Sequence, residues 1–213
     1  VDPRTWYPED RRAMRAMLQI PDNARVAVCH CRIDIHRKGI DILLDAWREL
    51  VRREPGMDLR LHLIGDGQDR GRLQDELDRA PVKGLRWFDK FNQDRADMRR
   101  HLSAADLHVQ ASRHEGFAVA PLEAMACGLP TVLSRAPGAS DLLNNGEDSG
   151  GLLVPIGEPQ ALANAVLALL TDDARRARAA VNAQRCVASA AGIRAVGEQL
   201  VEFLSSEPRA ARA

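Results

Sequence analysis

Apolar and polar positions along the chain follow two different periods. Short apolar runs, typical of buried strands, are separated by longer segments in which apolar residues recur every three or four positions, typical of amphipathic helices. The segment Arg25–Cys31 (RVAVCHC) predicts the first strand. The pattern from Gly39 to Arg53 predicts a helix, which Pro55 and Gly56 would end.

Five more strands are predicted, and helical segments separate most of them. Such alternation predicts an α/β fold: a doubly wound, Rossmann-like parallel sheet of six strands with helices on both faces. The segments 32–38 and 135–139 are predicted as loops. The further strands are expected at Leu59–Ile64, Leu85–Phe88, Leu107–Gln110, Pro130–Ser134 and Gly151–Val154. Helices are expected through Leu73 and Leu77, near Asp94–Ala104, from Val119 to Gly128, and from Glu158 to Leu204 with breaks near Asp172 and Gly192.

Charge and composition narrow the classes of partner. The 30 Lys and Arg residues balance the 30 Asp and Glu residues of this 213-residue chain, so its formal charge is +0 and nucleic acid is not an expected partner. No apolar stretch approaches the ~20 residues that span a bilayer, and the N-terminal segment is charged where a signal peptide would be apolar. We therefore expect a cytoplasmic protein without a transmembrane segment, which leaves peripheral association with a membrane open.

The four cysteines do not predict a metal site. Cys29, Cys31, Cys127 and Cys186 lack the CxxC spacing of zinc sites. His30 lies between the first two, but alternation along a strand points its side chain to the opposite face. Packing is therefore the preferred interpretation of His30, and no metal ligand is predicted.

Loops that follow the strands are where an open parallel sheet binds ligands. Arg32 and Lys38 lie at the two ends of the loop after the first strand, where both cations could converge on a diphosphate. The alternative interpretation is that they are solvated loop charges. The turn at Gly65–Gly67 lacks the third glycine of a dinucleotide fingerprint and follows the second strand, so it predicts a tight turn whose Gly65 backbone could line a cleft.

The segment 114–130 (HEGFAVAPLEAMACGLP) carries the most information about chemistry. Pro121 fits the first turn of a helix, which leaves the amides of Phe117, Ala118 and Val119 to donate to an anion. A helix N-terminus at this edge of the sheet favours phosphate.

Two carboxylates lie in the same segment. Glu115 precedes the predicted helix, and Glu123 lies one turn inside it. Their placement suits carboxylates that accept hydrogen bonds from sugar hydroxyls better than a metal pair or a glycosidase acid/base pair. The alternative makes Glu115 a helix-dipole residue and Glu123 a solvated helix position.

These motifs together resemble those of a known enzyme family. The ordered combination of Arg32…Lys38-Gly39, IGDG at 64–67, SRHEGF at 112–117, EAMACGLP at 123–130 and GLLV at 151–154 is similar to the C-terminal, donor-binding domain of retaining GT-B glycosyltransferases, specifically glycosyltransferase family 4. The resemblance covers about residues 1–170. It implies a metal-independent, retaining transfer of a hexosyl-type sugar from a nucleoside diphosphate sugar to an acceptor hydroxyl, with no other cofactor.

The resemblance also implies roles for individual residues. Arg32 and Lys38 match the cations that bind the donor diphosphate, and Glu115 matches the carboxylate that holds the transferred sugar; these three form the expected catalytic set. Glu123 matches the carboxylate that binds the ribose diol. The remaining expected donor contacts are the backbone amides of Gly116, Phe117, Ala118 and Val119, the turn at Gly65, and the segment around Lys90 and Phe91, which would meet the base.

Several departures from the family accompany these matches, among them Ala118 and the length of the chain. Ala118 replaces the commoner glycine and adds a methyl group near the expected phosphate or sugar. The second departure is length, which fits one GT-B domain. Residues 1–190 are expected to form the nucleotide-sugar-binding domain. Residues 191–213 are expected to form a C-terminal helix and frayed tail, matching the crossover helix to an N-terminal acceptor domain. That domain is missing from the pattern, and without it sugar transfer is not expected. A nucleotide-sugar sensor or scaffold and a GT-B sugar-nucleotide epimerase are the alternative functions.

Overall fold

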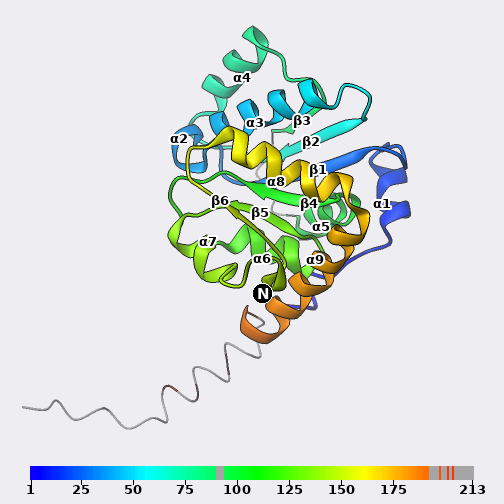
Figure 1. Ribbon diagram of the computed structural model, residues 1–213, viewed down its shortest axis with the longest axis vertical. Helices are drawn as coiled ribbons and strands as arrows, with labels where there is room; N and C mark the ends of the chain where they lie inside the picture. The colour runs from blue at the N-terminus through cyan, green and yellow to red at the C-terminus, as the bar shows by residue number, and fades with distance from the viewer. Residues whose placement is uncertain (90–93, 192–196, 198–200, 202, 204–213) are drawn as a thin grey trace, which may run out of the picture.

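Six parallel strands form the centre of the protein (Figure 1). The computed structural model describes residues 1–89, 94–191, 197, 201 and 203. The sheet order is β3-β2-β1-β4-β5-β6, and every neighbouring pair is parallel. The strand bounds, each within one residue of the prediction, are Arg25–His30 (β1), Leu59–Ile64 (β2), Leu85–Phe88 (β3), Leu107–Gln110 (β4), Thr131–Ser134 (β5) and Gly151–Val154 (β6). The predicted doubly wound α/β sheet is confirmed.

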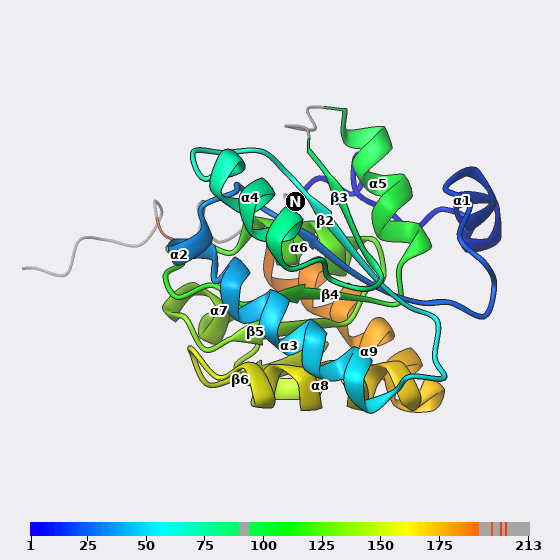
Figure 2. The ribbon, with the colours of Figure 1, turned by 90° about the horizontal axis from the view of Figure 1, so that it is seen from above.

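Helices cover both faces of this sheet (Figure 2). On one face α3 and α8 lie side by side, with α4 beyond them; the other face carries α1, α5, α6 and α9. Residues alternate between the two faces along β1, where Ala27 and Cys29 pack into one core and Val26 and Val28 into the other. The α-helices are Arg11–Met17 (α1), Ile35–Lys38 (α2), Ile40–Arg53 (α3), Arg70–Arg79 (α4), Arg95–Ala104 (α5), Val119–Ala126 (α6), Pro137–Leu142 (α7), Pro159–Thr171 (α8) and Asp173–Cys186 (α9), with a 3-10 turn at Gly146–Ser149 and a π turn at Val187–Ala191.

Three local predictions are corrected. The segment 32–38 contains the one-turn helix α2, because the side chain of Asp34 accepts a hydrogen bond from Arg37 N and caps it. The segment 135–139 gives way to α7, which begins at Pro137, a residue suited to a first helical turn. The helix α1 was not predicted at all, since its seven residues bury only Met14 and Arg15 and have no apolar stripe.

The long helical segment after residue 158 breaks where expected. Thr171 ends α8, and the side chain of Asp172 caps α9 by accepting a hydrogen bond from Arg175 N at 2.8 Å. The second expected break, near Gly192, and most of the predicted C-terminal unit 191–213 lie outside the described residues. In the ranges that the structure describes, no helix is both long and apolar enough to cross a membrane.

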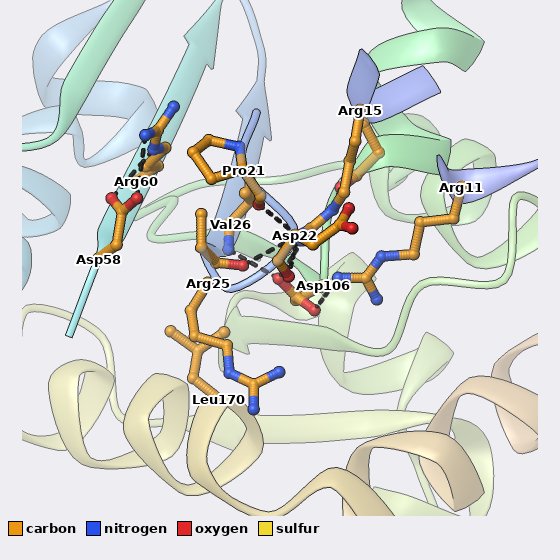
Figure 3. Close-up of polar contacts among 12 residues, drawn as sticks. Arg11, Arg15, Pro21, Asp22, Arg25, Val26, Asp58, Arg60, Asp106 and Leu170 are labelled. Carbon is orange, nitrogen blue, oxygen red and sulfur yellow. Dashed lines mark hydrogen bonds and ion pairs between the residues drawn. The ribbon is translucent and has the colours of Figure 1, made fainter. Parts of the chain in front are cut away.

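A buried carboxylate fixes the N-terminal segment to the amino end of the sheet (Figure 3). Asp106, just before β4, accepts hydrogen bonds from Arg15 at 2.9 Å, from Arg11 at 2.6 Å and from Val26 N at 2.7 Å. Arg15 also donates to four backbone carbonyls, those of Pro21, Asp22, Ala24 and Ala104. This network holds α1 against the sheet without an apolar stripe on the helix.

Candidate functional site

A cavity of about 540 Å³ opens at the carboxyl ends of β1 and β4. These two strands are neighbours, and the strand order reverses between them, which is where doubly wound sheets bind ligands. A second cavity, of about 510 Å³, lies around the amino ends of β2 and β3, away from this edge. The first cavity is lined by His30, Cys31, Arg32, Asp34, Arg37, Lys38, Gln68, Gln110, Glu115, Phe117, Ala118, Val119, Ala120 and Glu123.

The loops after β1 and β4 are tied together beside this cavity. Gly39, which ends α2, has φ +61, and a Cβ atom there would lie 2.0 Å from the carbonyl oxygen of Ala111. Only glycine permits that backbone conformation and that close approach. Arg113 completes the junction: its N–H donates to the carbonyl of Arg37, and its guanidinium pairs with Asp41 at 2.7 Å. The junction places the end of α2 against the loop that carries Glu115.

Three donors converge on one oxygen of Glu115. The Nζ of Lys38 lies 2.6 Å from Oε1, the hydroxyl of Ser112 donates to it at 2.8 Å, and Nε2 of Gln110 donates to the same oxygen. The side chains of Lys38 and Glu115 are largely buried. These contacts hold the carboxylate on Oε1, so its second oxygen is the one available to a ligand hydroxyl.

The other carboxylate, Glu123, is held by a histidine. Nε2 of His30 lies 3.1 Å from Oε2 of Glu123, and the His30 ring packs edge-on against His108 at a centroid distance of 5.2 Å. Burial and the neighbouring His30 hold the pKa of His108 well below its ordinary value, so that ring is neutral.

The start of α6 faces the cavity. No side chain among the described residues caps this helix at Ala118, so its first turn is open to a polar ligand. Of the four predicted amides, that of Val119 donates to the carbonyl of Phe117 at 3.0 Å, within the turn. The Phe117 side chain is 73% exposed at the rim of the cavity.

Most of the predicted site residues meet in this one cavity. Seven of them line it: Arg32, Lys38, Glu115, Phe117, Ala118, Val119 and Glu123. Gly116 and Gly65 do not: the carbonyl of Gly116 packs against Gly138 of α7, and Gly65 forms the expected tight turn, with its carbonyl accepting a hydrogen bond from the Trp87 indole at 3.0 Å. Lys90 and Phe91 lie outside the described residues.

Among the lining residues that the sequence does not identify, His30 and Gln110 contact the two glutamates. His30 points away from the neighbouring cysteines, as predicted, but it contacts Glu123 and is more than a packing residue. Gln110 contacts Glu115. The signal that could have found them is position: each is the last residue of a strand whose carboxyl end meets the cavity. Across the described residues, no group of three or more histidine, cysteine or carboxylate side chains could hold a metal ion.

We compared the sequence with known protein families. Residues 24–172, more than half of the chain, match the family described as "Glycosyl transferases group 1". The chain belongs to this family. Its fold is therefore that of a glycosyl transferase domain.

Two curated bacterial enzymes are similar to this glycosyl transferase domain. The lipopolysaccharide core biosynthesis glycosyltransferase LpsE of Rhizobium meliloti is 31% identical over 194 residues, which cover 91% of this chain and 54% of LpsE. A GDP-mannose-dependent monoacylated alpha-(1-6)-phosphatidylinositol monomannoside mannosyltransferase of Corynebacterium glutamicum is 29% identical, over 95% of this chain and 52% of the relative. The chain spans about half the length of these curated relatives.

Among solved structures, the domain is similar to Anabaena HepE in complex with UDP-glucose. The TM-score is 0.81 and the identity 26%, with 97% of this chain and 56% of HepE covered. About half of HepE, which was solved with UDP-glucose bound, thus has the fold of this chain.

Proposed function

We propose that this glycosyl transferase domain binds a nucleoside diphosphate sugar in the cavity between β1 and β4, as the donor half of a retaining, metal-independent enzyme of glycosyltransferase family 4. The observation that carries the proposal is the convergence of two cations, Arg32 and Lys38, and two carboxylates, Glu115 and Glu123, on one cavity at the point where the strand order reverses. The complex of HepE with UDP-glucose supports this class of ligand.

The diphosphate binds at the cationic side of the cavity. Arg32 offers a planar multidentate donor and Lys38 a point charge. The start of α6 offers the N–H groups of Ala118 and Ala120 and the positive end of the helix dipole. Because Lys38 already pairs with Glu115, the bound diphosphate shares its ammonium with that carboxylate. These cations supply the positive charge that a divalent metal would otherwise bring to the leaving group.

The carboxylates orient the rest of the donor. Glu123 accepts hydrogen bonds from the ribose diol, while the second oxygen of Glu115 accepts them from hydroxyls of a hexosyl sugar. Gln110, Ser112 and Lys38 hold the first oxygen of Glu115, so the second keeps a defined direction.

Sugar transfer breaks the bond between the anomeric carbon and the diphosphate oxygen and forms one to the acceptor hydroxyl oxygen. In a retaining reaction the acceptor attacks from the face that the diphosphate leaves, and a phosphate oxygen takes the acceptor proton. Arg32, Lys38 and the amides of α6 stabilise the negative charge that develops on the diphosphate. The curated relatives are about twice as long, so we propose that a second domain holds the acceptor and that this chain alone binds donor without transferring sugar.

Calorimetry against a panel of UDP-, GDP- and ADP-sugars tests the proposal. One member should bind saturably, and Arg32→Ala or Glu123→Ala should weaken it by about 10- to 100-fold, the loss expected for a hydrogen bond to a charged group. Arg72→Ala is the matched control, because Arg72 is exposed on α4 and does not line the cavity. A folded sample that binds no member, or that converts a donor to its epimer without an acceptor, would overturn the proposal.

A further inference from the structure

Polar side chains lie where this fold normally places apolar ones. Strands β1 and β4 are central and covered by helices on both faces, a setting that favours continuous apolar sequence. Yet His30, His108 and Gln110 lie on these two strands and are only 6%, 0% and 4% exposed. Burying polar groups is unfavourable unless they form hydrogen bonds. The contacts of these three side chains therefore indicate their role.

His30 makes its side-chain contact through one ring nitrogen. Its Nε2 lies 3.1 Å from Glu123, whereas its Nδ1 is buried and has no hydrogen-bond partner among the described residues. An ionised carboxylate only accepts hydrogen bonds, so Nε2 carries the proton and donates. The hydrogen bond of this buried ring is therefore the one to Glu123, and His108 packs against the ring.

Gln110 is used in the same one-sided way. Its Nε2 donates to Ser112 Oγ at 2.9 Å and to Oε1 of Glu115, while its own Oε1 is buried without a partner in the described part of the chain. Rotating the amide by 180° would place its oxygen against the carboxylate of Glu115, so the carboxylate determines the orientation of the amide. The orientation that lets Nε2 of Gln110 donate to Glu115 therefore leaves Oε1 of Gln110 without a hydrogen bond among the described residues.

We propose that His30 and Gln110 are positioning residues for the two donor-binding carboxylates, His30 for Glu123 and Gln110 for Glu115. The inference rests on the proposed function, in which Glu123 binds the ribose and Glu115 the transferred sugar. His30 then controls affinity for the nucleoside portion of the donor, and Gln110 controls discrimination between the sugar-bearing donor and the bare nucleoside diphosphate. The two residues thus act on different parts of one ligand.

The test compares two ligands for each variant of the 213-residue chain: the nucleotide sugar that binds best in the panel and the corresponding nucleoside diphosphate. His30→Val should weaken both ligands by the same factor, about tenfold for one hydrogen bond to a carboxylate. His30→Gln, whose amide nitrogen reaches the position of Nε2, should restore most of that affinity. His30→Asn keeps an amide but is too short to reach Glu123, and it should behave as His30→Val.

Gln110→Leu should affect the two ligands differently, unlike His30→Val. It should weaken binding of the nucleotide sugar by about tenfold and binding of the nucleoside diphosphate by much less, because only the sugar binds Glu115 directly, whereas the diphosphate meets Glu115 only through the shared Lys38. His62→Phe is the matched control, since it replaces a buried polar ring that packs against Phe88 and His101, away from His30 and both carboxylates. Circular dichroism and urea unfolding establish that each variant is folded.

The outcomes separate this inference from the proposed function. If Glu115→Ala and Glu123→Ala weaken binding while the His30 and Gln110 variants bind as wild type, only the inference fails. The inference also fails if the His30 and Gln110 variants weaken both ligands by the factor seen for His62→Phe, which a purely structural role would produce. If wild type binds no nucleotide sugar, or if the two glutamate variants bind as wild type, the proposed function fails and the inference fails with it.

Discussion

Replacing Asp106 by asparagine is expected to destabilise the protein strongly. The carboxylate is 0% exposed and faces three guanidinium groups, of which that of Arg15 is only 3% exposed. Burial lowers the pKa of Arg15, yet arginine keeps its proton, so the charge stays buried when its partner is neutralised. The Asp106→Asn change therefore leaves an uncompensated cation in the core (Figure 3).

The size of the effect follows from burial. Breaking a buried pair by removing one partner costs about 3–5 kcal/mol, and the half-exposed Arg11 adds at most about 1 kcal/mol. Domains of this kind are stable by about 5–15 kcal/mol, so the change removes a large share. Asp58→Asn is the control: Asp58 pairs with Arg60 at 2.9 Å, but both side chains are about one-third exposed, and the expected loss is below about 1 kcal/mol.

Urea unfolding monitored by circular dichroism measures both variants. The midpoint should fall strongly for Asp106→Asn and little for Asp58→Asn, with the slope m unchanged. A double variant, Arg15→Met with Asp106→Leu, should recover much of the loss, because it removes both charges from the core. Equal midpoints for the two single variants would refute the reasoning from burial.

Histidine, glycine and cysteine positions allow three further tests. Burial lowers the pKa of His62 from 6.5 to about 3, so unfolding takes up a proton below pH 6.5 and stability falls as the pH drops toward 3. The loss at pH 5 is roughly 2 kcal/mol, and His62→Gln should lose less between pH 7 and pH 5 in urea titrations; an equal loss would contradict this. Gly39→Ala should destabilise by several kcal/mol in the same assay, roughly the cost of a severe backbone clash, whereas Gly116→Ala, where a Cβ meets nothing within 4 Å, should change stability by less than about 1 kcal/mol. Burial raises the pKa of the Cys127 thiol to about 12, so iodoacetamide should label it only after unfolding, and labelling of the native protein would argue against this burial.

Local sequence was sufficient to predict most of the secondary structure. Strands such as Leu59–Ile64 are apolar runs bounded by turn residues, and that signal does not depend on the rest of the chain. It failed at α1 and α2, which are short and lack an apolar stripe. The contact that decides α2 is the capping hydrogen bond to Asp34. The contact that decides α1 is the ion pair of Arg15 with Asp106, and these two residues lie 91 positions apart.

The candidate site was also only partly predictable from local sequence. Its motifs identified Arg32, Lys38, Glu115 and Glu123, because a helix start after a strand with these residue types is a local pattern. The contacts among them are not local: Lys38 and Glu115 lie 77 positions apart, and His30 and Glu123 lie 93 positions apart. They meet because β1 and β4 are neighbours in the sheet, and that order results from packing of the whole chain. The sequence by itself determined the elements and the chemistry available at their ends, and only the tertiary structure decided which side chains hold the two carboxylates.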